Sequence, residues 1–216
     1  WGVLHDGTNP YQGAINCIRE LNETSSEIII ITNSGKREKD NLNRIINMGF
    51  KSSWIDNIIS SGETAWKALA SFNLPVKIKY PINCYIISRN KDDGLKWIKN
   101  NPGGHYVSDI LKADIILLLG IPDDSKESNF KKIFKKSLSK NIPLLCANPD
   151  LYSPRKDGKI VISSGKIAQS YKKIGGNVYM FGKPYSPIFN YLFQLSKAED
   201  KKRIAVIGDS IEHDIL

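Results

Sequence analysis

Short apolar runs alternate along the chain with longer segments in which apolar residues recur every three or four positions. The run Glu27–Thr32 (EIIIIT) is rich in β-branched residues, and it precedes Glu38–Met48, where Leu42, Ile45 and Ile46 have helical spacing. Runs of the first kind predict buried strands, and the periodic segments predict amphipathic helices. This alternation is typical of an α/β protein with a parallel sheet.

The same alternation continues to the end of the sequence. Two further helices are predicted early in the chain, at Trp54–Ile59 and Glu63–Phe72. Later strands are predicted at Cys84–Ser88, Asp114–Leu119, Pro143–Ala147, Lys159–Ile162, Asn177–Phe181 and Arg203–Ile207, and later helices at Gly94–Lys99, Asn129–Ser139, Lys166–Ile174 and Ser186–Leu195. No internal repeat or low-complexity segment interrupts the pattern.

Two breaks divide this series into three stretches. Pro75 and Pro81 bracket a segment with the composition of a linker, and Gly175-Gly176 forms a second candidate connection. The stretch after the second break repeats the strand, loop and helix order of the first stretch. We therefore expect one α/β core, formed by residues 1–75 and 177–216, interrupted by an inserted α/β domain at residues 76–176.

Composition narrows the class of protein. The 216 residues are 41% hydrophobic and 25% charged, which is ordinary for a globular chain. The longest apolar runs, Ile28–Ile31 and Ile115–Leu119, fall far short of the roughly 20 residues that span a bilayer. Cys17, Cys84 and Cys146 have no metal-ligand spacing and are odd in number. Together with the absence of a signal-like start, this favours a cytoplasmic protein without disulfides or structural zinc.

The chain carries 31 Lys and Arg against 22 Asp and Glu, a formal charge of +9. A basic surface can bind nucleic acid, but most of these lysines are scattered along the sequence. The densest stretch, Lys126–Lys140, has apolar residues near helical spacing between its lysines, which favours a solvated amphipathic helix. Nucleic-acid binding is therefore disfavoured, and a polyanion patch on this helix is the weaker alternative.

Three of the predicted strands end in polar loops. These loops are Thr32-Asn33-Ser34, Gly182-Lys183-Pro184, and Gly208-Asp209 continuing to Asp214. Because the carboxyl ends of parallel strands meet at one edge of a sheet, a hydroxyl, a lysine and two carboxylates are expected to lie together. Such a set suits a phosphate group and a divalent cation. Taken singly, each loop is also explained as an ordinary turn, helix cap or surface lysine.

In this order the motifs resemble those of the haloacid dehalogenase-like hydrolases, in the subclass with a large α/β cap. They are WGVLHDG at residues 1–7, ITNSG at 31–35, FGKPYSPIF at 181–189 and VIGDSIEHDI at 206–215. CANPD at residues 146–150 is similar to a segment of the family's cap, and the loop at 158–165 also fits it. The resemblance implies a Rossmann-like parallel-sheet core with an inserted α/β cap domain.

The resemblance also implies a function and a set of site residues. It indicates a Mg²⁺-dependent phosphatase that acts on a small phosphorylated metabolite, such as a sugar phosphate, through an aspartyl-phosphate. The expected catalytic residues are Thr32, Lys183 and Asp214, and the expected metal ligands are Asp209 and the backbone carbonyl of Trp1. Asn33, Ser34, Asn148 and Asp150 are expected to contact the substrate. Association into a homodimer is left open.

The sequence departs from the family pattern at its start. The nucleophilic aspartate of the family would lie two residues before Trp1, and Trp1 itself occupies the place of the aspartate that protonates the leaving group. Indole cannot exchange a proton in this way. Either His5 or Asp6 substitutes, or turnover is slow, or the protein binds phosphorylated metabolites without turnover. A dinucleotide oxidoreductase would share the α/β alternation, but no GxGxxG follows an early strand.

Overall fold

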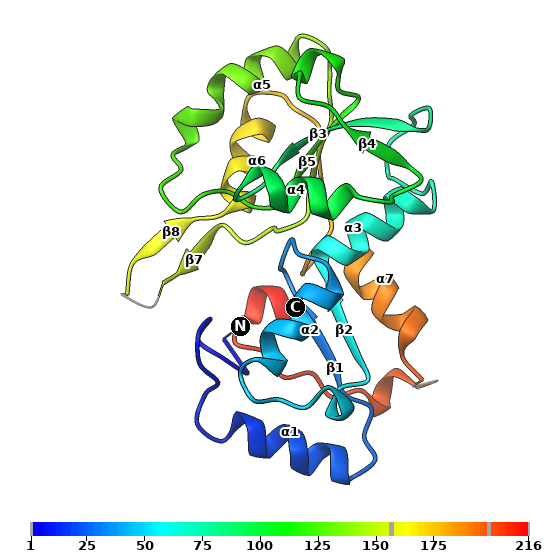
Figure 1. Cartoon of the computed structure of the whole chain (residues 1–216), viewed down its shortest axis with the longest axis vertical. Coiled ribbons are helices and arrows are strands. Elements are labelled where there is room, and N and C mark those ends of the chain that lie inside the picture. The colour runs from blue at the N-terminus through cyan, green and yellow to red at the C-terminus, as the bar shows by residue number, and fades with distance from the viewer. Residues whose placement is uncertain (1, 156–157, 198–199, 216) are drawn as a thin grey trace.

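The computed structural model describes residues 2–155, 158–197 and 200–215. These residues form two α/β bodies, one above the other, with α3 (Ser61–Ala70) running between them (Figure 1). The prediction of an α/β fold with parallel strands is confirmed. Within the described ranges, every helix is too short or too polar to cross a membrane.

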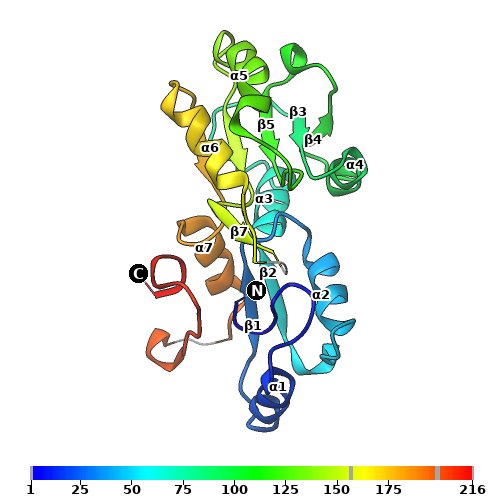
Figure 2. The ribbon, with the colours of Figure 1, turned by 90° about the vertical axis from the view of Figure 1, so that its left-hand side faces the viewer.

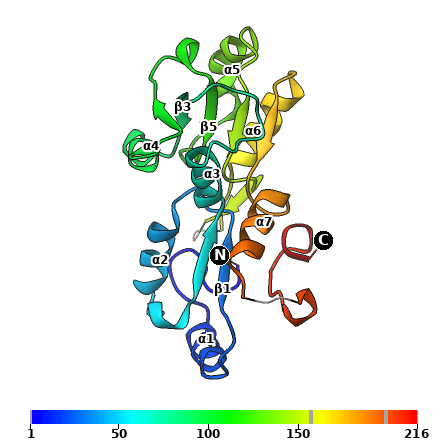
Figure 3. The same cartoon turned by 90° about the vertical axis from the view of Figure 1, so that its right-hand side faces the viewer.

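The lower body is built on two parallel strands, β1 (Ile29–Thr32) and β2 (Asn57–Ser60). The helix between them, α2 (Glu38–Ile46), lies on one side of this pair, and α7 (Ser186–Leu195) lies on the other, as both side views show (Figures 2 and 3). Ile45 of α2 packs with Phe50 and Ile58, and α1 (Ala14–Glu23) closes this layer from below. The apolar residues that recur along each helix therefore lie on the face that covers the strands.

The upper body is a five-stranded parallel sheet with helices on both faces. Its strands, in spatial order, are β4 (Gly104–Tyr106), β3 (Ile82–Ile87), β5 (Ile115–Leu118), β6 (Leu144–Cys146) and β9 (Val178–Met180). Helices α3 and α4 (Lys91–Ile98) pack on one face, and α5 (Lys131–Leu138) and α6 (Ser164–Lys173) pack on the other. All of β5 is buried, which explains its uninterrupted apolar sequence.

An antiparallel hairpin, β7 (Tyr152–Pro154) and β8 (Ile160–Ile162), projects from the upper body beside the sheet (Figure 1). Two contacts join the bodies near α2. The Lys96 ammonium on α4 lies 2.7 Å from an Asp40 carboxylate oxygen on α2. A Cβ atom on Gly35 would lie 1.8 Å from the carbonyl oxygen of Leu119, so the two backbones meet there with no room for a side chain.

The helix predicted at Trp54–Ile59 is wrong. A short 3₁₀ turn covers Ser52–Trp54, and the residues after it form strand β2. Six residues are too few for periodicity to separate a helix from a strand. Pairing with β1, in the register Ile29 to Asn57 through Thr32 to Ser60, decides the outcome.

The strand predicted at Asn177–Phe181 forms, but it lies in the upper sheet. Val178–Met180 pairs with β6 in the register Leu144 to Val178, whereas the sequence grouped this strand with the core. The pairing satisfies the free backbone edge of β6, which local sequence does not reveal. The chain therefore leaves the upper sheet after Met180.

The strand predicted at Arg203–Ile207 is also wrong in this structure. A 3₁₀ turn covers Lys201–Arg203, and the following residues have irregular backbone in which Val206 is 57% exposed and Ile207 is 72% exposed. A strand requires a neighbour to complete its hydrogen bonds. Among the described residues, β1 pairs with β2, and no strand pairs with the segment 204–207.

Candidate active site

The residue after β1, Asn33, joins three distant parts of the chain. Its Oδ1 accepts a hydrogen bond from the backbone N–H of Lys183 at 2.7 Å. Its Nδ2 donates to the Lys183 carbonyl at 3.1 Å and to Asp150 Oδ1 at 2.8 Å. Asn33 is only 7% exposed, so these bonds replace water that the amide would otherwise bind. Three of the residues singled out from the sequence are thus in direct contact.

The absence of a side chain on Gly182 allows the Lys183 backbone to reach Asn33. A Cβ atom on Gly182 would lie 2.3 Å from Ser61 Oγ and 2.5 Å from Asn33 Oδ1, so the loop before Lys183 can approach only as glycine. The fully buried Ser61 hydroxyl lies 3.4 Å from Asn33 Oδ1 and 3.4 Å from the Thr32 carbonyl. Ser61 was not predicted as a site residue, because the run before it has a sequence that was interpreted as a helix and is strand β2. Had this run been predicted as a strand beside β1, the polar residues at its end would have been candidate site residues.

Lys183 and Asp214 form an ion pair inside the site. The Lys183 ammonium contacts Asp214 Oδ1, and the two side chains are 16% and 7% exposed. Asp214 Oδ2 accepts a further hydrogen bond from the Ser210 backbone N–H at 3.2 Å. Both carboxylate oxygens therefore have a partner, which a buried charge requires. Asp214 holds the lysine in place at the end of the Asn33 network.

Asp209 lies in the same turn as Asp214, with its carboxylate exposed. A Cβ atom on Gly2 would lie 2.0 Å from Asp209 Oδ2, so the backbone at the start of the chain passes directly against this carboxylate. No described residue forms a hydrogen bond or ion pair with the Asp209 side chain. Trp1, whose carbonyl is the other predicted ligand, lies outside the described residues.

This donor set fits Mg²⁺ better than a metal that needs several side chains. Within the ranges that the structure describes, no three His, Cys, Asp or Glu residues are grouped to hold an ion. Mg²⁺ typically takes one or two carboxylates and completes its octahedron with waters and substrate phosphate oxygens. One free carboxylate against a glycine backbone is consistent with such a site.

Thr32 and Ser34 form the turn at the end of β1. The Ser34 backbone N–H donates to Thr32 Oγ1 at 3.3 Å. Both residues line a small cavity of about 50 Å³ together with His5 and Arg44, whose guanidinium donates to the Gly7 carbonyl. The turn therefore places the Thr32 and Ser34 hydroxyl groups at the strand end, where an anion could be held.

A buried ion pair supports the loop after β1. Glu63 is 1% exposed, and its two carboxylate oxygens accept from Arg37 Nε at 2.5 Å and Arg37 Nη2 at 3.0 Å. Its Oε2 also accepts from the Glu38 backbone N–H at 3.2 Å. Ser60 Oγ donates to the Lys36 carbonyl at 2.6 Å. These bonds fix the part of the loop that precedes α2. Asn33 and Ser34 lie at the opposite end of the same loop, directly after β1.

Asn148, in the loop after β6 of the upper body, shapes its own turn. Its Oδ1 accepts from the backbone N–H of Asp150 at 3.1 Å, and its carbonyl accepts from Cys146 Sγ at 3.1 Å. Of the two cap residues predicted to contact substrate, the structure thus brings Asp150 to Asn33, whereas Asn148 positions Asp150.

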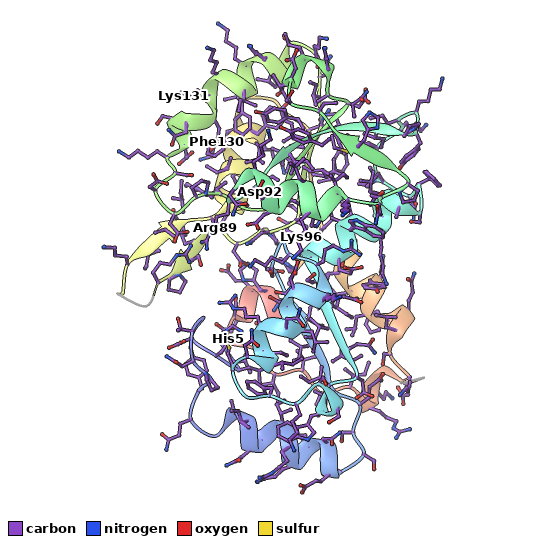
Figure 4. All side chains as sticks on the ribbon, in the orientation of Figure 1. His5, Arg89, Asp92, Lys96, Phe130 and Lys131 are labelled. Atoms are coloured by element: carbon purple, nitrogen blue, oxygen red, sulfur yellow. The ribbon has the colours of Figure 1, made fainter. Side chains whose placement is uncertain are left out.

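His5 and Asp6 are the two candidates to replace the acid that Trp1 cannot supply. His5 is 6% exposed, and burial, with smaller contributions from nearby positive charge, lowers its pKa to about 4. Its Nδ1 accepts from the Gly7 N–H at 3.0 Å, which assigns the imidazole proton to Nε2. His5, in the lower body near α2 (Figure 4), is therefore neutral near pH 7 and poorly suited as an acid. Asp6 Oδ1 accepts from the N–H groups of Thr8 and Asn9, both at 2.7 Å, in a local turn.

Comparison with known proteins shows which family and which solved structures this chain is similar to. A family model described as haloacid dehalogenase-like hydrolase matches residues 1–88. A haloacid dehalogenase-like hydrolase from Brucella suis 1330 has a TM-score of 0.86 at 23% identity, covering 100% of this chain and 77% of that chain. No curated protein matches.

Two further solved structures have the same fold. The p-nitrophenyl phosphatase from Archaeoglobus fulgidus has a TM-score of 0.76 at 20% identity, covering 100% of this chain and 78% of that one. A glycerol phosphate phosphatase from Mycobacterium tuberculosis in complex with magnesium has a TM-score of 0.69 at 17% identity, covering 90% of this chain and 55% of that one.

The fold is therefore that of a Rossmann-like core combined with a second α/β body, as in these proteins. By sequence, residues 1–88 match the family model of the haloacid dehalogenase-like hydrolases, which agrees with the resemblance that the motifs indicated.

Proposed function

We propose that the protein is a Mg²⁺-dependent phosphoric monoester hydrolase that acts on a small phosphorylated metabolite, with sugar phosphates among the candidates. The observation that carries this proposal is the Asn33 network, which brings the Lys183–Asp214 ion pair to the end of β1. A fixed lysine together with hydroxyl and backbone N–H donors is the arrangement that a phosphoryl group requires.

In the proposed reaction, the Thr32 hydroxyl, the backbone N–H group of Asn33 and the Ser34 hydroxyl bind the phosphoryl oxygens. Lys183 neutralises the charge that is spread over these oxygens in the transition state, and Asp214 keeps the ammonium oriented toward them. Asp150, held by Asn33, lies at the boundary with the upper body and contacts the leaving group. The upper body excludes water from the reacting atoms.

Asp209 would hold Mg²⁺ together with the backbone at the start of the chain. When bound there, the ion would supply charge neutralisation for the phosphoryl oxygens. The covalent step belongs, under the same proposal, to an aspartate two positions before Trp1. Its carboxylate would form the new bond to phosphorus as the ester oxygen leaves, and water would then release phosphate. The free cysteines fit a cytoplasmic location for this enzyme.

A second candidate function is binding of a phosphorylated metabolite without appreciable turnover. It is favoured by Trp1 at the acid position and by the low pKa of His5, which leave the ester oxygen without an evident proton donor. General acid catalysis is typically worth ~10²–10⁴-fold in rate. Trp1→Asp is therefore expected to increase kcat by up to ~10²-fold if the missing acid limits hydrolysis.

The deciding experiment uses the protein together with the residues that precede Trp1. Hydrolysis of 4-nitrophenyl phosphate and of a panel of small phosphate esters is measured with Mg²⁺ and with EDTA, in parallel with binding of inorganic phosphate by calorimetry. Mg²⁺-dependent turnover that is lost in Lys183→Met supports the hydrolase, and Lys172→Met, an exposed lysine of α6, serves as the matched control. Phosphate binding that depends on Lys183 without turnover supports the binding protein. If the protein shows no turnover and no phosphate binding, both functions are ruled out.

A further inference from the structure

The upper body contains a cavity of about 560 Å³ that the proposed phosphatase reaction does not use. Its walls are the last residues of β3, the first turn of α4, the loop after β5 and the segment that leads into α5. None of the residues assigned to the proposed active site lines it. The volume falls within the range of about 300–1,000 Å³ that is usual for small-molecule sites.

The position of this cavity follows from the sheet topology. From β3 the chain passes through α4 to β4 on one side, and from β5 it passes through α5 to β6 on the other side. The loops that leave the adjacent strands β3 and β5 therefore diverge. This is a topological switch point, the place where parallel α/β sheets bind ligands.

The floor of the cavity is apolar and aromatic. Phe130 and Ile87 are 7% and 8% exposed, and the rings of Tyr85 and Tyr106 beside them are half-buried. Burial raises the pKa of Tyr85, so its hydroxyl remains a hydrogen-bond donor at neutral pH. Figure 4 shows Phe130 in the upper body, on the segment that leads into α5. Such a floor suits a flat apolar group.

The rim carries one charge of each sign. Lys91 and Asp124 are both exposed, and neither side chain has a hydrogen bond or ion pair with any described residue. The neighbouring Asp123 is different, because Arg155 Nε lies 2.8 Å from its Oδ2 and this contact holds its pKa below the usual range. The cavity thus presents a free ammonium and a free carboxylate above an aromatic floor.

The charges near the rim disfavour a phosphorylated ligand. Asp92 and Asp93 lie in the first turn of α4, and Asn90 Oδ1 already accepts from the Asp93 N–H at 2.8 Å. The N-terminus of this helix is therefore capped and flanked by negative charge, which repels a dianion. We propose that the cavity binds an aromatic α-amino acid, with its carboxylate at Lys91, its ammonium at Asp124 and its ring against Tyr85, Tyr106 and Phe130. The site is independent of the proposed phosphatase function.

Binding of L-phenylalanine tests the proposal directly. Calorimetry is expected to give saturable 1:1 binding, and NMR is expected to show amide shift changes at residues 88–94 and 121–129. Two analogues test the two charges separately, because 3-phenylpropanoate lacks the ammonium and phenethylamine lacks the carboxylate. Each is expected to bind roughly tenfold more weakly, which is the usual effect of losing one charged hydrogen bond.

Two exposed variants assign each charge to its partner. Lys91→Ala is expected to weaken phenylalanine binding roughly tenfold and to leave phenethylamine unchanged, and Asp124→Ala is expected to spare 3-phenylpropanoate instead. Asp92→Ala and Lys131→Ala are the matched controls, since both residues are exposed nearby and neither lines the cavity (Figure 4). An unchanged melting temperature shows that each variant is folded. No saturable binding at millimolar phenylalanine, equal binding of the analogues, or shift changes elsewhere would overturn the proposal.

Discussion

The carboxyl ends of parallel strands form a candidate site in both the lower and the upper body, but the two sites differ in polarity and size. At the end of β1, Asn33 hydrogen-bonds to the backbone of Lys183, and the Lys183 ammonium contacts Asp214. The cavity lined by Thr32 and Ser34 at this strand end is about 50 Å³. At the ends of β3 and β5, the cavity is about 560 Å³ and its two rim charges have no described partner. A prearranged polar set suits chemistry on a small charged group, whereas an open apolar cavity suits binding of a larger molecule.

The largest expected effect is in the lower site. Lys183→Met removes the charge that is proposed to face the phosphoryl group and leaves the Asp214 carboxylate buried without its partner. We expect kcat for 4-nitrophenyl phosphate to fall ~10²–10³-fold and the free energy of unfolding to fall by about 3 kcal/mol. Urea unfolding and steady-state kinetics measure the two effects.

The double variant Lys183→Met/Asp214→Asn separates these two effects. It removes the unpaired charge, so we expect it to regain most of the lost stability while remaining inactive. Recovery of activity in the double variant would contradict the role given to Lys183.

The next effect concerns Asp209, whose carboxylate is exposed and outside the ion-pair network. Asp209→Asn is expected to abolish Mg²⁺-dependent hydrolysis, because a neutral amide cannot balance the charge of the ion as a carboxylate does. The melting temperature should stay within about 2 °C of wild type, since a surface substitution rarely changes stability by more than ~0.5 kcal/mol. Glu212→Gln in the same turn is the control. Near-native Mg²⁺-dependent turnover in Asp209→Asn would remove it from the site.

A smaller effect is expected from the buried imidazole of the lower body. The pKa of His5 is lowered from 6.5 to about 4. Below pH 6.5 the unfolded chain therefore binds a proton that the folded chain does not, so stability falls with decreasing pH and the loss levels off near pH 4. We expect a loss of at most about 3 kcal/mol over this interval. His5→Gln should flatten the profile, and the exposed His105→Gln should not.

The smallest effect is expected at the rim of the upper cavity. Lys91 and Asp124 have no described partner to lose, so Lys91→Ala and Asp124→Ala should each change the free energy of unfolding by less than about 0.5 kcal/mol. A loss comparable to that of Lys183→Met would show that the rim residues are structural. The comparison between the two strand ends would then fail.

Part of the candidate site was predictable, because polar residues directly after an apolar run, as at Thr32 to Ser34, lie at the end of a parallel strand. Lys183 also follows a predicted strand, but that strand pairs in the upper sheet, and the segment before Asp209 and Asp214 forms no strand. A common sheet edge therefore does not explain the contact between Lys183 and Asp214. The roles of Thr32, Asp150 and the other site residues in binding or catalysis remain predictions.

The parts that the sequence did not reveal depend on partners rather than on local pattern. Ile58 and Ile59 become a strand because β1 lies beside them, and this strand end then places Ser61 near Asn33. Val178–Met180 joins the upper sheet because β6 needs a neighbour. Val206 and Ile207 have strand-like sequence but no described strand beside them. The upper cavity could not be predicted because it depends on the faces that α4 and α5 cover.

The close approach of Gly35 to Leu119 has a mechanical consequence. Two backbones touch there without an intervening side chain, and the Lys96–Asp40 ion pair lies on the same side of the molecule as α2 and α4. Such a contact fixes the distance between the two bodies at this point, because a side chain on Gly35 would overlap the Leu119 carbonyl. A methyl group there would push the loop after β5, which forms one wall of the upper cavity, away from the end of β1.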